Sequence, residues 1–164
     1  MKLDYIFLDI DGVLNNYDSP YSDYDFTIKM EDEAIQSLEE LIATYNTKII
    51  ISSTWRENKS LDYLKNLFGN YSEDVSNSII DLTPQINFAD RELEINTWLK
   101  DNEALNSKFI ILDDRSDFQK LKGNLYLVDP YKGLKLENLQ KIHSLIGKIN
   151  KKGRFSLKRL FSKK

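Results

Sequence analysis

Short apolar runs that alternate with helical patterns are the feature of this sequence that most constrains its fold. Five runs are rich in Ile, Leu, Val and aromatic residues: 5–8, 48–51, 78–82, 109–112 and 125–128. Apolar residues spaced three and four apart predict helices over 31–45, 58–68, 90–100 and 136–149. Continuous apolar strands alternating with helices are typical of a parallel sheet covered on both faces. We therefore predict a single α/β domain with a five-stranded, mainly parallel, Rossmann-like sheet.

Composition restricts the available chemistry. The 164 residues are 41% hydrophobic, which suits one domain with one core. Cysteine is absent and His143 is the single histidine, so disulfides and thiolate chemistry are excluded and a zinc site is disfavoured. No apolar run approaches the ~20 residues of a membrane span, and the first residues lack the layout of a signal peptide. These features favour a cytoplasmic protein without stable membrane insertion.

Charge is distributed unevenly along the chain. The formal net charge is -3, yet the stretch from Lys148 onward holds eight basic residues and no acidic one. The residues before it hold the other 15 basic and all 26 acidic residues, a formal charge of -11. We therefore divide the chain into a folded domain, 1–147, and a basic C-terminal tail, 148–164. The tail suits contact with nucleic acid or an anionic membrane surface; the alternative is a disordered solubilising end.

The residues directly after three of the predicted strands are carboxylates and hydroxyls: Asp9, Asp11, Ser52, Ser53, Asp113 and Asp114. In parallel sheets ligands bind beyond the carboxyl ends of the strands, so we expect these side chains to share one site. Clustered carboxylates repel one another unless a cation neutralises them. Magnesium prefers a few carboxylates together with water and phosphate oxygens. The sequence therefore predicts a Mg²⁺ site at this edge of the sheet.

The first acidic pair also suits covalent catalysis on phosphate. A carboxylate such as Asp9 can attack phosphorus and form an acyl phosphate. Asp11, two residues further on, can protonate the leaving oxygen and later activate water. The alternative is that the acidic pairs are turns that cap helices.

These segments resemble the haloacid dehalogenase (HAD) superfamily of phosphatases. The stretch 7–15, with its apolar strand followed by Asp9, Asp11 and Gly12, is similar to the first HAD motif. The run 49–51 ending at Ser52 is similar to the second motif, and 110–112 followed by Asp113 and Asp114 to the fourth. The resemblance covers roughly residues 4 to 147. It implies a HAD-like domain that is capless or carries a small flap.

The resemblance assigns roles to individual residues. It makes Asp9 the nucleophile and a metal ligand, and Asp11 the acid/base, with its main-chain carbonyl on the metal. Ser52 would hydrogen-bond the transferring phosphoryl group, with Ser53 as the alternative if the strand ends one residue later. Asp113 would be the acidic metal ligand, with Asp114 and Asp117 near it.

The cation of the third motif is less clearly marked. Arg91, which opens a predicted helix, is the best candidate to offset phosphate charge, and the alternative is a surface arginine. Trp55 and Arg56 lie just past the second strand. We expect them to form part of the substrate wall, with Arg56 on phosphate, unless Trp55 packs under the following helix. Asp129 ends the fifth strand and either orients the site or opens a turn.

A narrower likeness concerns the small HAD domains of the Swiss-army-knife RNA repair type. It rests on four segments: 53–56, 91–99, 112–114 and 129–134. It implies a phosphorylated substrate that is a nucleotide or a nucleic-acid end, and tyrosines of the expected flap, 16–27, could stack on a base. The alternatives are a small-metabolite or protein phosphatase and a non-catalytic HAD-like binding module.

Overall fold

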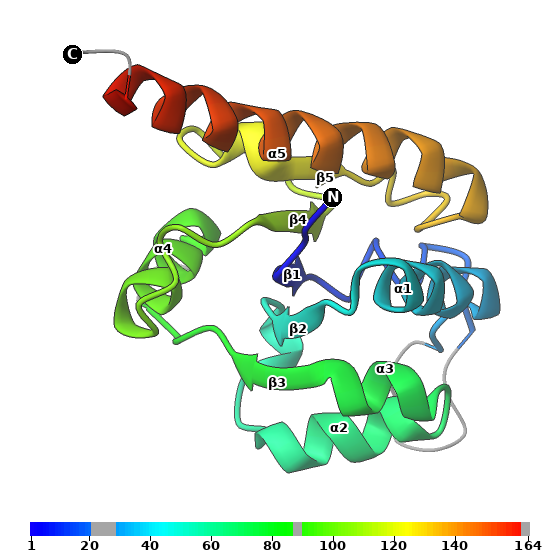
Figure 1. The fold of residues 1–164 in the computed structure, drawn as a ribbon. Coiled ribbons are helices and arrows are strands. Elements are labelled where there is room, and N and C mark those ends of the chain that lie inside the picture. Colours follow the sequence, from blue (N-terminus) through cyan, green and yellow to red (C-terminus); the bar gives the residue numbers. More distant parts are fainter. Residues whose placement is uncertain (21–28, 87–89, 162–164) are drawn as a thin grey trace.

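The structure, a computed structural model, describes residues 1–20, 29–86 and 90–161, with side chains up to Lys151. Five strands form one sheet: β1 (Tyr5–Leu8), β2 (Lys48–Ile51), β3 (Ile79–Leu82), β4 (Phe109–Asp113) and β5 (Leu125–Leu127). Their order across the sheet is β3-β2-β1-β4-β5, and all four neighbouring pairs are parallel (Figure 1). This confirms the predicted Rossmann-like α/β fold. Each strand matches its predicted run to within one residue at either end.

Five α-helices surround the sheet: α1 (Asp32–Tyr45), α2 (Leu61–Gly69), α3 (Glu73–Ser78), α4 (Arg91–Asp101) and α5 (Leu139–Phe161). Three short 3₁₀ turns also occur: η1 (Thr54–Arg56), η2 (Lys122–Asn124) and η3 (Leu136–Asn138). Two differences from the sequence prediction stand out. The short polar helix α3 was not predicted, and α5 continues twelve residues past its predicted end at Ile149.

Two apolar clusters cover the two faces of the sheet. The larger one joins β1, β2 and β4 to α1, α2, α3 and α5, with Leu8, Leu38 and Ile146 fully buried in it. The smaller one packs α4 and Phe118 against Phe7 and the opposite face. Alternate residues of each central strand thus enter opposite clusters, as expected for a strand buried on both sides. Figure 1 shows α4 on one side of the sheet and α1 on the other.

Candidate functional site

The acidic residues predicted to form the site meet at the carboxyl edge of the two central strands. Leu8 of β1 pairs with Leu112 of β4, so Asp9 and Asp113 come next on adjacent strands. The main-chain amide of Asp9 donates to Leu112 O (2.9 Å) and continues the ladder. Carboxylate oxygens of Asp9, Asp113 and Asp114 all lie within 4.8 Å of one another. We call these three residues the carboxylate cluster.

A tight turn after β1 sets the shape of the cluster. Gly12 has φ +74°, and a Cβ at this position would lie 2.5 Å from Asp114 Oδ2 and 3.0 Å from Pro130 Cβ. Only glycine fits here, because the conformation and the space both exclude a side chain. The Gly12 amide donates to Asn15 Oδ1 (2.9 Å), and Asn15 is 1% exposed. Asn15 was not singled out from the sequence; its position in the turn after the acidic pair was the only signal.

Arg91 is the cation that contacts the cluster. Its Nη1 lies 3.3 Å from Asp9 Oδ1 and 3.4 Å from Asp113 Oδ2, and its side chain is 5% exposed. The residue opens α4 directly after the N-cap Asp90, whose side chain accepts from Leu93 N (2.9 Å). The structure therefore brings the predicted third-motif arginine to the two central aspartates, as the resemblance implied, and excludes the surface alternative.

Arg56 and Glu94 form a buried ion pair behind Arg91. Arg56 Nη2 lies 2.6 Å from Glu94 Oε2, and both side chains are at most 5% exposed. The same Glu94 oxygen lies 3.9 Å from Arg91 Nε. Arg56 also donates to the main-chain carbonyls of Ser53 and Thr83. These contacts occupy most of the donors of the Arg56 guanidinium. Its binding to phosphate stays a prediction, and the buried ion pair with Glu94 disfavours it.

The two serines after β2 face different partners. Ser53 is fully buried, and its hydroxyl lies beside the Asp9 carboxylate, where it lowers the pKa of Asp9; it also accepts from Trp55 N (3.4 Å). The Ser52 hydroxyl accepts from Thr83 Oγ1 (3.5 Å). β2 ends at Ile51, so Ser52 directly follows it. The serine that contacts the predicted nucleophile is nevertheless Ser53, which was the alternative choice.

Asp11 lies at the exposed side of the same edge. Asn15 Nδ2 donates to its Oδ1 (2.9 Å), and the indole Nε1 of Trp55 donates to its Oδ2 (2.8 Å). Trp55 also packs against the larger apolar cluster, and its predicted part in a substrate wall stays a prediction. It binds the carboxylate that the sequence predicts to be the acid/base.

Three further acidic or basic candidates lie outside the cluster. Asp117 is exposed and pairs with Arg115 (2.6 Å), and Asp129 accepts from Tyr131 N (3.0 Å) in the turn it opens. His143 Nδ1 lies 2.7 Å from the Tyr45 hydroxyl, where its role is structural.

Burial and crowding shift the titration of the cluster. Burial and the nearby Asp9 charge raise the pKa of Asp113 to about 7, despite Arg91. Burial also raises the pKa of Asp9, opposed by Arg91 and by the hydrogen bond from Ser53. Burial and Asp9 raise the pKa of Asp114. Three carboxylates that resist ionisation together are an electrostatic arrangement that a further cation would relieve.

The donor set fits a hard divalent cation. The cluster offers three carboxylates, and neither cysteine nor the single histidine takes part in it. Arg91 supplies one positive charge to two buried aspartates, so the positive charge at the site is smaller than the negative charge of the ionised carboxylates. Oxygen ligands of this kind suit Mg²⁺. The geometry of the cluster supports a divalent metal site.

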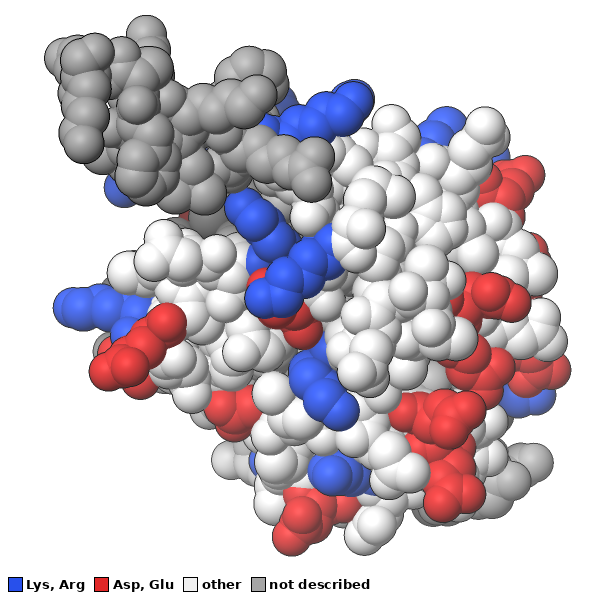
Figure 2. Space-filling model, viewed as in Figure 1, with Lys and Arg blue, Asp and Glu red and all other residues white. Residues whose placement is uncertain are grey.

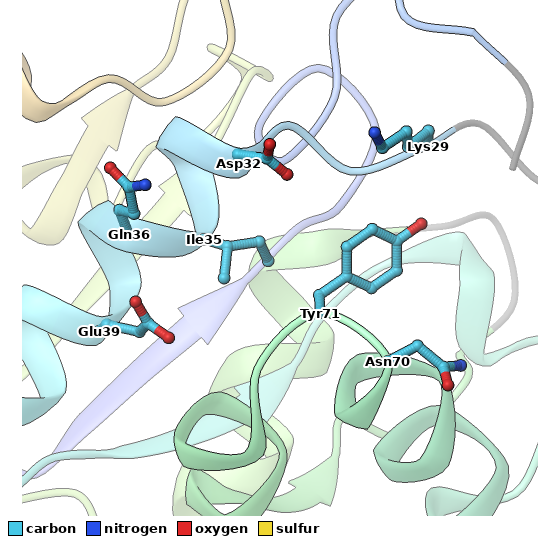
Figure 3. Close-up of a pocket in the computed structure, with 7 residues that line it drawn as sticks. All are labelled: Lys29, Asp32, Ile35, Gln36, Glu39, Asn70 and Tyr71. Atoms are coloured by element: carbon cyan, nitrogen blue, oxygen red, sulfur yellow. The ribbon is translucent and has the colours of Figure 1, made fainter.

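Two hollows lie away from the cluster. One, of about 370 Å³, opens between α1 and the Asn70–Tyr71 turn, with Lys29, Ile35 and Glu39 among its lining residues (Figure 3). None of the candidate site residues lines it. The other, of about 560 Å³, lies between the segment after Asn15 and the segment after β5, with Asn16, Tyr131 and Lys132 in its wall. It borders the loops that carry the site.

Comparison with known proteins agrees with this geometry. The model of the HAD domain in Swiss Army Knife RNA repair proteins matches residues 5–139, which is most of the chain. No curated protein and no solved structure matches the chain. The matched region contains the carboxylate cluster, Arg91, Trp55 and all five strands. The chain therefore belongs to the family of HAD domains in Swiss Army Knife RNA repair proteins, and this membership indicates a HAD-type hydrolase.

Proposed function

We propose that the protein is a Mg²⁺-dependent phosphomonoester hydrolase that forms an aspartyl phosphate on Asp9. One observation carries the proposal: Asp9 lies in a buried cluster with Asp113 and Asp114, and Arg91 Nη1 contacts both Asp9 and Asp113. A buried carboxylate next to a cation and a metal-type donor set suits attack on a phosphate dianion, whose charge those groups would offset.

The residues then have defined roles. Asp9 attacks phosphorus through one carboxylate oxygen while the bond to the leaving oxygen breaks, and Asp11 gives its proton to that oxygen. Asp11 next takes a proton from water, which attacks the aspartyl phosphate and releases inorganic phosphate and free Asp9. Arg91 contacts Asp9, the Ser53 hydroxyl lies beside it, and we assign both to the transferring phosphoryl group.

A bound Mg²⁺ would supply positive charge to the phosphoryl oxygens. Asp9, Asp113, Asp114 and the main-chain carbonyl of Asp11 are the groups we assign to it. Its preference for few carboxylates plus phosphate oxygens agrees with three carboxylates and an open exposed side at Asp11.

For the substrate we propose a nucleotide or a nucleic-acid end. The rings of Tyr17 and Tyr131 meet edge to face with centroids 4.9 Å apart, and they are 67% and 72% exposed. They stand on the two segments that enclose the Gly12 turn, since Pro130 borders Gly12. Exposed aromatic rings beside a phosphate site favour a substrate with a base that can stack. The RNA repair context in the family's name supports the same class.

The test is hydrolysis of p-nitrophenyl phosphate by purified protein with Mg²⁺, with EDTA, and with Asp9→Asn as the matched control. We expect turnover with Mg²⁺, loss of turnover in EDTA that added Mg²⁺ restores, and a loss of about 10³-fold or more in Asp9→Asn, because the amide keeps the shape but removes the nucleophile.

Full activity in metal-free buffer, or a near wild-type rate for a folded Asp9→Asn protein, would refute the mechanism. A folded wild type without any phosphatase activity would favour the binding-module alternative. Among active outcomes, faster hydrolysis of phosphorylated sugars or phosphopeptides than of nucleotides and oligonucleotide ends would favour a metabolite or protein phosphatase.

A further inference from the structure

Both carboxylate oxygens of Asp11 are held by side chains from different parts of the chain. Trp55 Nε1 donates to Oδ2 (2.8 Å), and Asn15 Nδ2 donates to Oδ1 (2.9 Å). Asp11 itself is exposed. An exposed aspartate would otherwise sample several rotamers in water. The two hydrogen bonds therefore restrict a side chain that burial leaves free.

Each of the two donors is itself fixed. Asn15 is 1% exposed, and its Oδ1 accepts from the Gly12 amide, which orients its Nδ2 toward Asp11. Trp55 lies in η1, its main-chain amide donates to Ser53 Oγ (3.4 Å), and Lys59 Nζ lies 5.1 Å from its ring centroid. The indole N–H is therefore presented to Asp11 by a constrained turn.

The turn that holds Trp55 also reaches the nucleophile. The Ser53 hydroxyl lies beside the Asp9 carboxylate and lowers its pKa, and Trp55, two residues later, donates to Asp11. Asp9 and Asp11, two residues apart after β1, are thus matched by Ser53 and Trp55, two residues apart after β2. A displacement of one group by about 1 Å costs a reaction of this kind up to about 100-fold.

We propose that Trp55 is a positioning residue for Asp11, which it aims at the leaving oxygen in concert with Asn15. This inference rests on the proposed phosphatase function. It assigns the Trp55 indole N–H a part in proton transfer to the leaving group. This part is distinct from any contribution of the same hydrogen bond to the stability of the fold. A hydrogen bond that served stability alone would affect all substrates equally.

The experiment compares two aryl phosphates of similar size. p-Nitrophenolate leaves with little help from an acid, whereas the more basic phenolate needs its oxygen protonated in the transition state. Trp55→Phe keeps an aromatic ring and deletes the donor. We expect it to lower kcat for phenyl phosphate about tenfold or more and kcat for p-nitrophenyl phosphate far less, with KM for both nearly unchanged. Asp11→Asn should show the same selectivity more strongly.

Trp98→Phe is the matched control. Trp98 Nε1 also donates to an aspartate, Asp81 Oδ2 (2.6 Å), but neither residue belongs to the site. This variant should leave the ratio of the two rates at the wild-type value, and thermal unfolding will define the temperature at which all variants are folded. An unchanged ratio in Trp55→Phe, or an equal loss on both substrates, would overturn the inference while leaving the phosphatase intact. Absence of activity in the wild type would instead refute the proposed function.

Discussion

At the scale of single residues, Asp113 has its carboxyl group buried next to another carboxyl group. It is fully buried beside Asp9, and its pKa is raised to about 7. In the unfolded chain the same carboxyl has its ordinary pKa of 3.8. Between about pH 4 and 7 the unfolded chain therefore loses a proton that the folded metal-free protein keeps. The free energy of unfolding must fall as pH rises through this window, and the deficit is complete above pH 7.

Asp113→Asn should therefore stabilise the metal-free protein at high pH, because the amide never carries the charge. We expect its Tm in EDTA at pH 8 to exceed that of the wild type by several degrees, because the raised pKa of Asp113 lowers wild-type stability at that pH and ~1 kcal/mol corresponds to roughly 2–4 °C for a chain of this size. Thermal unfolding from pH 4 to 8 measures this, and the difference should vanish near pH 4. In Mg²⁺ we expect the order to reverse.

Asp117→Asn is the control for that measurement. Asp117 is exposed and pairs with Arg115, which lowers the pKa of Asp117. Its charged form is favoured in the folded state, so its removal should not raise the Tm at pH 8. A wild type that is as stable as Asp113→Asn at pH 8 in EDTA would contradict the electrostatic description of the cluster.

At the scale of elements, α4 ties the two buried arginines together. Its inward face carries Arg91, Glu94, Ile95, Trp98 and Leu99, at the spacing expected for one helical stripe. Glu94, 2% exposed, lies between Arg91 and Arg56. Removing one member of a buried ion pair typically costs about 3–5 kcal/mol, whereas replacing the pair with apolar residues is often neutral. Comparing a single with a double replacement therefore separates the contribution of the Arg56–Glu94 pair to stability from its contribution to activity.

Glu94→Gln should destabilise the protein strongly, because Arg56 stays buried without its counter-charge. The double variant Arg56→Met/Glu94→Leu should recover most of that stability. If Glu94 also holds Arg91 against the cluster, the double variant should still hydrolyse p-nitrophenyl phosphate about tenfold more slowly than the wild type. Denaturant unfolding and steady-state kinetics on both variants decide this. Recovery of activity together with stability would limit the ion pair to a structural role.

The elements also show which parts of the structure can be read from the sequence. The strands were predicted closely because runs such as 48–51 are β-branched and buried on both faces. Hydrophobicity alone places Leu93 on the buried stripe of α4, but Leu93 is 46% exposed and Glu94 is buried instead. The pattern misleads here because a polar residue is expected to be exposed, whereas Arg56 compensates the charge of Glu94 inside the protein. α3 was missed because its six residues carry one buried apolar side chain, Val75.

Within the site, the sequence pattern predicts which residues lie at the strand ends. The partners of those residues depend on tertiary contacts that the pattern does not contain. Asp9 follows β1, Asp113 ends β4 and Asp114 follows it, so their meeting could be predicted from topology alone. The pairing of Trp55 with Asp11 joins residues 44 positions apart, and no spacing in the sequence encodes it. The predicted flap, 16–27, falls largely outside the described residues. The five described residues at its start reach Pro20, whose carbonyl accepts from Lys29 N (2.7 Å).

At the scale of the whole molecule, charge is separated along the chain. The residues before Lys148 carry a formal charge of -11, and eight basic residues follow. On the face seen in Figure 2, basic side chains run through the middle and acidic ones gather toward one side. Among the helices that the structure describes, none combines the length and apolar character needed to cross a bilayer. An acidic domain approaches a polyanion poorly unless a cationic segment contacts it first.

The position of α5 places the basic stretch at the opposite edge of the sheet from the carboxylate cluster. Asn150 is bound to Lys2 through two hydrogen bonds, Lys2 N to Oδ1 (3.0 Å) and Nδ2 to Lys2 O (2.8 Å). Lys2 precedes β1, so this contact lies at the amino edge of the sheet, whereas the carboxylate cluster lies at the carboxyl edge. α5 then continues to Phe161. We propose that the basic stretch from Lys148 is a polyanion anchor that acts independently of hydrolysis.

Deletion of residues 151–164 tests this proposal, because it removes seven of the eight basic residues and keeps Asn150 in place. We expect the truncated protein to bind a single-stranded oligonucleotide more weakly at low salt, and the difference from the full chain should shrink as salt rises, since counter-ions screen the lost charges. Hydrolysis of p-nitrophenyl phosphate should not change. Fluorescence anisotropy with a labelled oligonucleotide measures the first effect, and vesicles of anionic lipid in a parallel titration show whether a membrane surface is the preferred partner. Equal oligonucleotide and vesicle binding by the two proteins at low salt would leave the basic stretch without an anchoring role.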